Sequence, residues 1–127
     1  MDIFDDLVSR WLSLPEVAEA LGVELRAVRE MLTERRFVAV HRGPDSVLSV
    51  PADFLVLEGE TSPIDGAPVV IPALLGTIIQ LGDNGFEDPE MVRWLFSEND
   101  ELGAVPIAAL RAGRTHAVRR AAQSLSF

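Results

Sequence analysis

The sequence has 127 residues, enough for one ordinary domain or for a small domain that shares its core with a helical extension. Its formal charge is -9, with 20 acidic residues against 11 basic ones, and it contains no cysteine. The acidic balance argues against a general nucleic-acid coat protein, because sequence-independent DNA affinity comes from cations that neutralise phosphates. The lack of cysteine excludes a disulfide framework and a thiolate metal site, and it suits a reducing compartment.

The hydropathy of the chain favours a cytoplasmic protein with no membrane contact. The longest apolar stretch, residues 69–81, is interrupted by proline, glycine and polar residues. It is also shorter than the roughly 18 residues expected of a membrane-spanning helix. The first residues are acidic where a secretory signal would be basic.

The charges are unevenly distributed along the chain. All the basic residues are arginines, and most lie in two clusters. The first cluster is Arg26, Arg29, Arg35, Arg36 and Arg42, and the second is Arg111, Arg114, Arg119 and Arg120. Between them, residues 53–101 hold 11 carboxylates and a single arginine, a local net charge of -10. We therefore expect a molecule with separate positive and negative faces.

The first elements in chain order are predicted to be helical. Residues 2–11 have apolar side chains at helical spacing and predict a short opening helix. Ser13 is a helix start signal for residues 14–21, and Gly22 is the matching stop signal. A second amphipathic helix is predicted over about 24–35.

The period then changes from helix to strand. Residues 37–40 and 47–50 are rich in strand-forming side chains, and residues 43–46 have the composition of a turn between them. Residues 51–57 predict a short helix that closes the hairpin, and residues 58–68 predict a linker.

The rest of the chain predicts four helices. They cover about 70–81, 89–97 with Asp88 as the cap, 106–112 and 114–125. The expected fold is therefore mostly α with a small β-hairpin wing: a winged helix-turn-helix followed by a C-terminal helical bundle. The expected domains are a winged helix-turn-helix over residues 1–57, a linker over 58–68 and a helical domain over 69–127.

Residue types between the first two predicted helices agree with a helix-turn-helix. Ala18 is small enough for the helices to approach, Gly22 allows the turn, and Val23 and Val28 fill the crevice. The alternative is an ordinary helix pair in a core, which would also show small and apolar residues at these positions.

The outer face of the second helix carries the candidate DNA contacts. Arg26 and Arg29 lie in its N-terminal part, which enters the major groove in a helix-turn-helix, where arginine can pair with guanine. Residues at the helix end and on the wing would contact phosphates or a minor groove. The full candidate set is Arg26, Arg29, Thr33, Arg35, Arg36, His41, Arg42 and Gly43. For each arginine taken alone, a solvated surface charge is the alternative.

Four strings carry a resemblance to a known family. They are Leu14–Val23 (LPEVAEALGV), Phe37–Arg42 (FVAVHR), Glu90–Phe96 (EMVRWLF) and Ala117–Gln123 (AVRRAAQ). The sequence resembles the small actinobacterial winged helix-turn-helix DNA-binding proteins, and its first half is also similar to excisionase and MerR-type winged helices. The resemblance implies sequence-selective binding of double-stranded DNA, with a role in transcription regulation, and hence a nucleoid-associated protein in the cytoplasm.

The mycobacterial member of that family is a substrate of a serine/threonine protein kinase. Its target threonine lies in an N-terminal extension, whereas the present sequence starts almost at the predicted fold. We therefore do not carry over an expectation of control by phosphorylation.

The C-terminal half leaves several interpretations open. The string from Glu87 to Phe96, with the turn at 99–103, resembles the toxin-binding helical module of some antitoxins, although plain packing explains most of these residues. The many apolar side chains of 69–79 and 91–96 favour a homodimer or a protein partner through these helices. The second arginine cluster, with His116, is either another phosphate-contacting face or a set of cations at a helix end.

The residue inventory argues against an enzyme. The sequence has two histidines and no cysteine, lysine or tyrosine, so few groups titrate near neutral pH. Gly76, Gly82 and Gly85 do not form a phosphate loop, which needs a lysine after its last glycine. The carboxylates from Asp83 to Glu90 lack the spacing of a calcium loop. We expect no catalysis, no cofactor and no metal.

Overall fold

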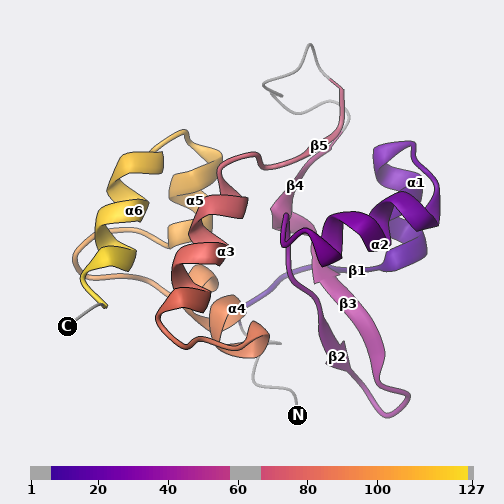
Figure 1. Ribbon diagram of the computed structural model, residues 1–127, viewed down its shortest axis with the longest axis horizontal. Coiled ribbons are helices and arrows are strands. Elements are labelled where there is room, and N and C mark those ends of the chain that lie inside the picture. The colour runs from indigo at the N-terminus through magenta and orange to yellow at the C-terminus, as the bar shows by residue number, and fades with distance from the viewer. Residues whose placement is uncertain (1–6, 58–66, 126–127) are drawn as a thin grey trace.

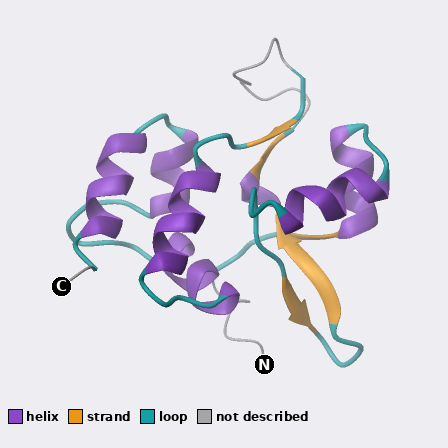
Figure 2. Cartoon of the chain, viewed as in Figure 1, coloured by secondary structure: helices purple, strands orange, loops and turns teal. Residues whose placement is uncertain are grey.

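The computed structural model describes residues 7–57 and 67–125. Its strands are β1 (Trp11–Ser13), β2 (Val40–Arg42), β3 (Val47–Pro51), β4 (Leu55–Val56) and β5 (Val69–Val70). Its helices are α1 (Leu14–Leu21), α2 (Leu25–Thr33), α3 (Leu74–Asp83), α4 (Asp88–Phe96), α5 (Pro106–Arg111) and α6 (Thr115–Gln123). Helices α1 and α2 lie at one end of the long axis and α6 lies at the other (Figure 1). The fold is mostly helical with small sheets, as predicted (Figure 2).

Helix α1 begins and ends where the sequence signals place its ends. The Ser13 hydroxyl accepts a hydrogen bond from the Glu16 N–H at 3.2 Å, and the Glu16 carboxylate accepts one from the Ser13 N–H at 2.8 Å. The bond from the Ser13 N–H to the carboxylate, followed by the influence of the Ser13 hydroxyl on the same carboxylate, holds the pKa of the Glu16 carboxyl below its usual 4.5. Gly22 ends the helix at φ 70°, a conformation that glycine adopts without a Cβ clash. The predicted cap and stop are confirmed.

The predicted opening helix is wrong for residues 7–11, and residues 2–6 lie outside the described part of the chain. The segment Trp11–Ser13 is instead strand β1, which pairs antiparallel with β3 so that Trp11 faces Pro51. Strand β2 pairs with the other edge of β3, giving the sheet order β1-β3-β2. The apolar spacing misled because the strand partner of Trp11, Pro51 on β3, is distant in the sequence and leaves no local signal.

The first predicted strand of the wing begins three residues too early. Residues Phe37–Ala39 are buried but do not form a strand, and β2 covers only Val40–Arg42. The chain leaves α2 through Arg35 at φ 64°, and the next apolar side chains enter the core before sheet pairing begins. The turn at 43–46 and strand β3 agree with the prediction.

The predicted short helix over 51–57 is partly wrong. Only residues Ala52–Phe54 form a 3-10 turn, after which β4 pairs with β5. This pairing crosses residues 58–66, so no local pattern indicates it. It also explains why α3 begins at Leu74 and not near residue 70.

Helix α4 starts one residue before the predicted start. Asp88 is its first residue, and the cap is Glu87, whose N–H donates to the Glu90 carboxylate at 3.0 Å. The predicted role of Asp88 as the cap is therefore wrong. Helices α5 and α6 lie within the two remaining predicted ranges.

One core joins the two halves of the chain. Buried side chains from α1, α2, the sheet and α3–α6 form one cluster, and the rings of Phe54 and Phe96 lie 5.5 Å apart between their centroids. The Arg111 guanidinium donates from Nη1 to the carbonyl oxygens of Asp53 at 3.0 Å and Leu55 at 2.6 Å. These contacts join the segment that follows the wing to α4 and α5.

Across residues 7–57 and 67–125, no helix combines the length and the apolar character that a membrane crossing requires.

Candidate nucleic-acid interface

Helix α2 has a buried stripe and an arginine-bearing solvent face. Val28 is fully buried in the middle of the helix. Arg26, Arg29, Glu30 and Thr33 are all exposed, and at 100° per residue they share one arc of the helix surface. The sequence predicted this face correctly, because an amphipathic helix of nine residues shows its two sides directly in its spacing.

The turn before α2 holds this face in place. The Val23 N–H donates to the Ala18 carbonyl at 3.0 Å, which closes the end of α1 around Gly22. Ala18 is buried and small, so α2 can pack closely across α1. Helix α2 therefore projects its outer face from a rigid pair of helices.

The two arginines on the N-terminal half of α2 are only lightly engaged. The Arg26 guanidinium lies 4.0 Å from the Glu24 carboxylate, and the two side chains are 83% and 84% exposed. An ion pair so exposed contributes little to stability and is readily exchanged for another anion. In the part of the chain that the structure describes, no carboxylate lies within 4.0 Å of the Arg29 guanidinium. Both side chains can therefore reach a ligand at low cost.

The remaining candidates at the end of α2 are held by protein groups. The Arg35 guanidinium forms a bidentate ion pair with Asp88 of α4, at 2.9 and 3.4 Å, and also contacts the Met91 sulfur at 3.7 Å. The Arg36 Nε donates to the Glu34 carboxylate at 2.9 Å. The Thr33 hydroxyl donates to the Arg29 carbonyl at 3.0 Å. Arg35 is thus turned toward the C-terminal half and away from the outer face of α2.

The wing positions the last three candidates. The Arg42 guanidinium lies over the Trp11 ring, 4.3 Å from its centroid. His41 Nδ1 lies 2.9 Å from the Ser46 carbonyl oxygen, so this nitrogen carries the donated proton. Gly43 opens the turn at φ 76° and is exposed at the tip. Trp11 could not be predicted as a neighbour of Arg42, because it lies on β1, outside the hairpin.

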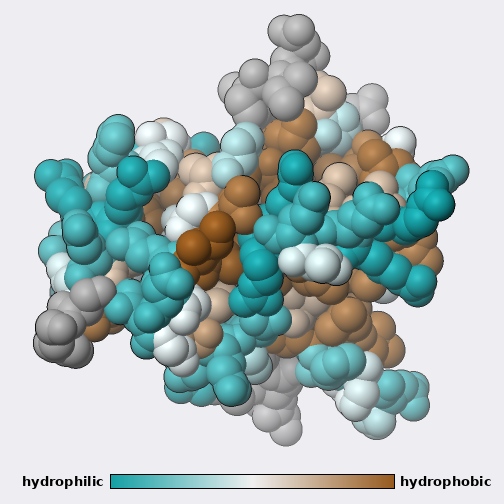
Figure 3. All heavy atoms as spheres, in the orientation of Figure 1, coloured by the Kyte–Doolittle hydropathy of each residue, from teal (hydrophilic) through white to brown (hydrophobic). Residues whose placement is uncertain are grey.

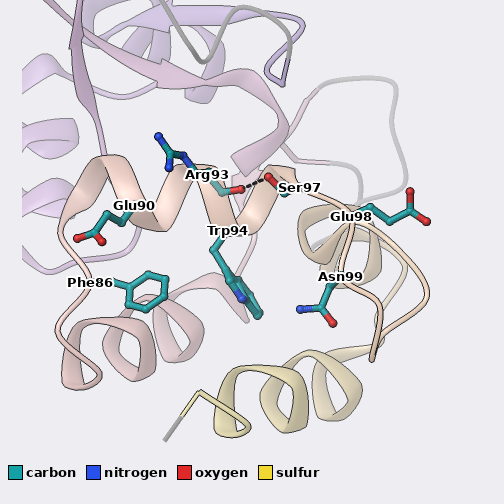
Figure 4. Close-up of a pocket in the computed structure, with 7 residues that line it drawn as sticks. All are labelled: Phe86, Glu90, Arg93, Trp94, Ser97, Glu98 and Asn99. Carbon is teal, nitrogen blue, oxygen red and sulfur yellow. Dashed lines mark hydrogen bonds between the residues drawn. The ribbon is translucent and has the colours of Figure 1, made fainter.

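A hollow of about 270 Å³ beside α4 was not predicted from the sequence. Figure 4 shows Trp94 extending into it and Arg93 extending from the opposite side of the helix. The Ser97 hydroxyl donates to the Arg93 carbonyl at 2.6 Å. Within the described ranges, no three histidine, aspartate or glutamate side chains are grouped closely enough to hold a metal ion.

Two helices joined by a glycine turn, followed by a hairpin in a three-stranded sheet, define a winged helix-turn-helix protein. Two family models match the chain: "DNA-binding protein Rv2175c, wHTH domain" over residues 2–55, and "Rv2175c C-terminal domain of unknown function" over residues 71–126. The chain belongs to the Rv2175c family.

A relative and a solved structure agree with this assignment. The Mycobacterium tuberculosis protein named DNA-binding protein Rv2175c is 32% identical, over 90% of this chain and 79% of its own length. The NMR structure of Rv2175c is similar to the present fold with a TM-score of 0.77 and 30% identity. That match covers all of this chain and 87% of the solved one. The predicted resemblance to a winged helix-turn-helix DNA-binding family with a mycobacterial member is confirmed.

Proposed function

We propose that this protein binds double-stranded DNA sequence-selectively and regulates transcription, with α2 in the major groove. The observation that carries the proposal is the outer face of α2, where Arg26 and Arg29 are both exposed and Arg26 is only weakly paired with Glu24. The mycobacterial relative is named a DNA-binding protein, which supports the same function here. The proposal involves no catalysis by the chain itself.

The contacts divide into two kinds. Arg26 and Arg29 read base edges, because the N-terminal part of the second helix is the part that enters the groove in this fold. Arg36 and Arg42 hold phosphates on either side. The stack on Trp11 restricts the Arg42 side chain before DNA binds, so less conformational entropy is lost on contact.

Thr33, His41 and Gly43 complete the proposed surface. Thr33 lies on the α2 face, and the other two lie on the wing, where a backbone N–H and an imidazole can approach phosphates. We assign Arg35 a packing role instead, because its guanidinium is bound to Asp88.

The charge of the chain sets how this binding should respond to salt. The net charge of -9 opposes approach to any duplex, so affinity for random DNA should be weak. Specific contacts by a few arginines must then supply most of the useful affinity. The expected behaviour is a selective binder whose slope of log affinity against log salt is about -0.9 for each phosphate contact.

The test is a titration of labelled duplexes at low salt, with a preferred site first selected from a pool of random sequences. Arg26→Ala and Arg29→Ala should each cost about 1–3 kcal/mol at that site and relax selectivity. Arg42→Ala should weaken all sequences alike and lower the slope of log affinity against log salt by about 0.9. Arg93→Ala is the matched control, because it removes an exposed arginine from α4. Equal binding by wild type and the Arg26/Arg29 double variant, or no binding by either, refutes the proposal.

The structure weakens the argument for a partner bound through the C-terminal helices. That expectation relied on surplus apolar side chains in 69–79 and 91–96, and most of them are buried within the chain itself. Ile79 is half exposed. A dimer or an antitoxin-like contact through this half stays a prediction. Sedimentation at tens of micromolar protein, together with co-purification, tests it.

A further inference from the structure

Helices α5 and α6 share local features with the helix pair α1 and α2. A proline stands in the first turn of each leading helix, at Pro15 and Pro106. Three residues later each helix has a buried alanine, Ala18 or Ala109. A small side chain at this position permits close approach of the following helix.

The two pairs also turn in the same way. Gly22 and Gly113 both have left-handed backbone, with φ of 70° and 84°. The N–H of the residue after each glycine donates to the carbonyl of that same alanine, at 3.0 and 2.9 Å. Helices α2 and α3 end in the same kind of left-handed turn, so the turn alone does not set these two helix pairs apart. The sequence of the second helix in each pair sets them apart.

Both second helices contain the string Ala-Val-Arg in the same orientation. Val28 and Val118 are both fully buried. The arginines that follow them, Arg29 and Arg119, are both exposed. The buried valine fixes the rotation of the helix and directs the next residue to solvent.

The exposed face of α6 is more cationic than that of α2. His116, Arg119, Arg120 and Gln123 are exposed and share one arc of the helix. The sequence of α6 contains no carboxylate, whereas α2 has Glu30 on its outer face. Within residues 7–57 and 67–125, no carboxylate lies within 4.0 Å of the α6 guanidinium groups. This concentration of positive charge stands out in a chain whose net charge is -9.

We propose that α6 carries a second DNA-contacting surface, which binds the phosphate backbone of a second duplex. The inference rests on the proposed DNA binding by α2. The two helices lie at opposite ends of the molecule (Figure 1), and hydrophilic side chains cover the α6 end (Figure 3). One molecule would then bridge two DNA segments, reading sequence at α2 and holding phosphates at α6.

The chemistry of the α6 face favours DNA over a second copy of this chain. Stable protein interfaces have an apolar centre that is depleted in charge. The large exposed apolar residues in the described chain are Val23, Val47 and Ile79, and none of them belongs to α6. Exposed arginines without an apolar centre are what phosphate contacts require.

The experiment measures capture of a second duplex. A duplex carrying the preferred site is fixed to beads, the full-length protein is bound, and a labelled duplex of random sequence is added at low salt. The wild type should retain the labelled duplex. Arg119→Ala/Arg120→Ala should still bind the fixed duplex but capture at least several-fold less of the labelled one. Arg119→Lys/Arg120→Lys should restore capture, because a phosphate contact needs the charge and not the guanidinium.

Controls separate this inference from folding and from the proposed function. Arg93→Ala should capture as the wild type does, and Arg119→Ala should capture less, although each removes one exposed arginine. Thermal unfolding confirms that the variants fold. If the wild type binds the fixed duplex but captures no second one, or if Arg119→Ala/Arg120→Ala captures normally, the inference fails and the proposed function stands. A change of oligomeric state in that variant, with unchanged capture, would assign α6 to a second copy instead. No binding to any duplex overturns both proposals.

Discussion

Variants of Arg35 test directly whether this residue at the end of α2 contacts DNA or stabilises the fold through its ion pair with Asp88. Its guanidinium is paired in bidentate geometry with Asp88, and the two side chains are 40% and 35% exposed. Partial exposure screens the charges, so we expect a coupling free energy of about 0.5–1 kcal/mol, near the upper end for surface pairs. A double-mutant cycle with Arg35→Ala and Asp88→Ala isolates this term from the interaction of Asp88 with the α4 dipole.

The backbone at Arg35 sharpens the prediction. At φ 64° a residue with a Cβ pays roughly 1–2 kcal/mol, which glycine avoids at an entropic cost of about 0.4–1 kcal/mol. Arg35→Gly should therefore be more stable than Arg35→Ala by about 0.5–1 kcal/mol, although both lose the ion pair. In a chain of this size, that difference shifts the melting temperature by a few degrees, roughly 2–4 °C.

The assay combines thermal unfolding with the salt dependence of DNA binding. If Arg35 has the packing role, both variants keep the wild-type slope of log affinity against log salt. A phosphate contact would instead lower that slope by about 0.9 in both variants. Zero coupling in the cycle, together with a reduced slope, would refute the reasoning and return Arg35 to the DNA surface.

Three further outcomes follow from the described contacts. Ser13→Ala removes the side-chain half of the cap on α1 and should cost about 1 kcal/mol in chemical denaturation. The pKa of the Glu16 carboxyl is depressed in the folded state, so its ionised form adds to the free energy of unfolding above pH 4.5. This stabilisation is lost as the pH falls through the folded-state pKa. Glu16→Gln should therefore lose less stability than the wild type on acidification. Arg111→Ala leaves the two carbonyl oxygens that it binds without these donors and should cost about 1–3 kcal/mol of unfolding free energy, with no change in DNA selectivity.

The helix-turn-helix was predictable because its signals are local. The cap at Ser13, the stop at Gly22 and the valine at the centre of α2 all act within a few residues of where they stand. The exposed pair Arg26 and Arg29 followed from the same helical spacing. Each of these features can be predicted from residues within the element itself or next to it.

The features that the sequence missed depend on distant partners. Strand β1 forms only because β3 lies beside it, and β4 forms only because Val69–Val70 returns from beyond residue 66. Apolar residues at positions 3, 4, 7, 8 and 11 suit a helix equally well, so spacing could not decide. Three-residue strands have too few side chains to show a period.

The candidate site shows the same division. The outer face of α2 was predictable, but the partner of Arg35 lies 53 residues away on α4. Likewise, the Trp11 ring under Arg42 comes from a strand that was expected to be helix. The sequence identified the arginines near the candidate interface, and only the fold shows which of them pair with other parts of the chain and which stay exposed.

The shared core has a consequence for how two DNA surfaces could work together. Phe54 against Phe96, and Arg111 on the β4 backbone, tie the winged half to α4 and α5, and buried residues of α2 and α6 belong to the same core. Helices α3 and α4 lie between them in Figure 1, within the acidic stretch of residues 53–101. A single duplex following the long axis would run past α3 and α4, whose exposed Asp83 and Glu90 repel phosphates. Two duplexes meeting the molecule at its two ends avoid that repulsion, and this favours bridging over wrapping.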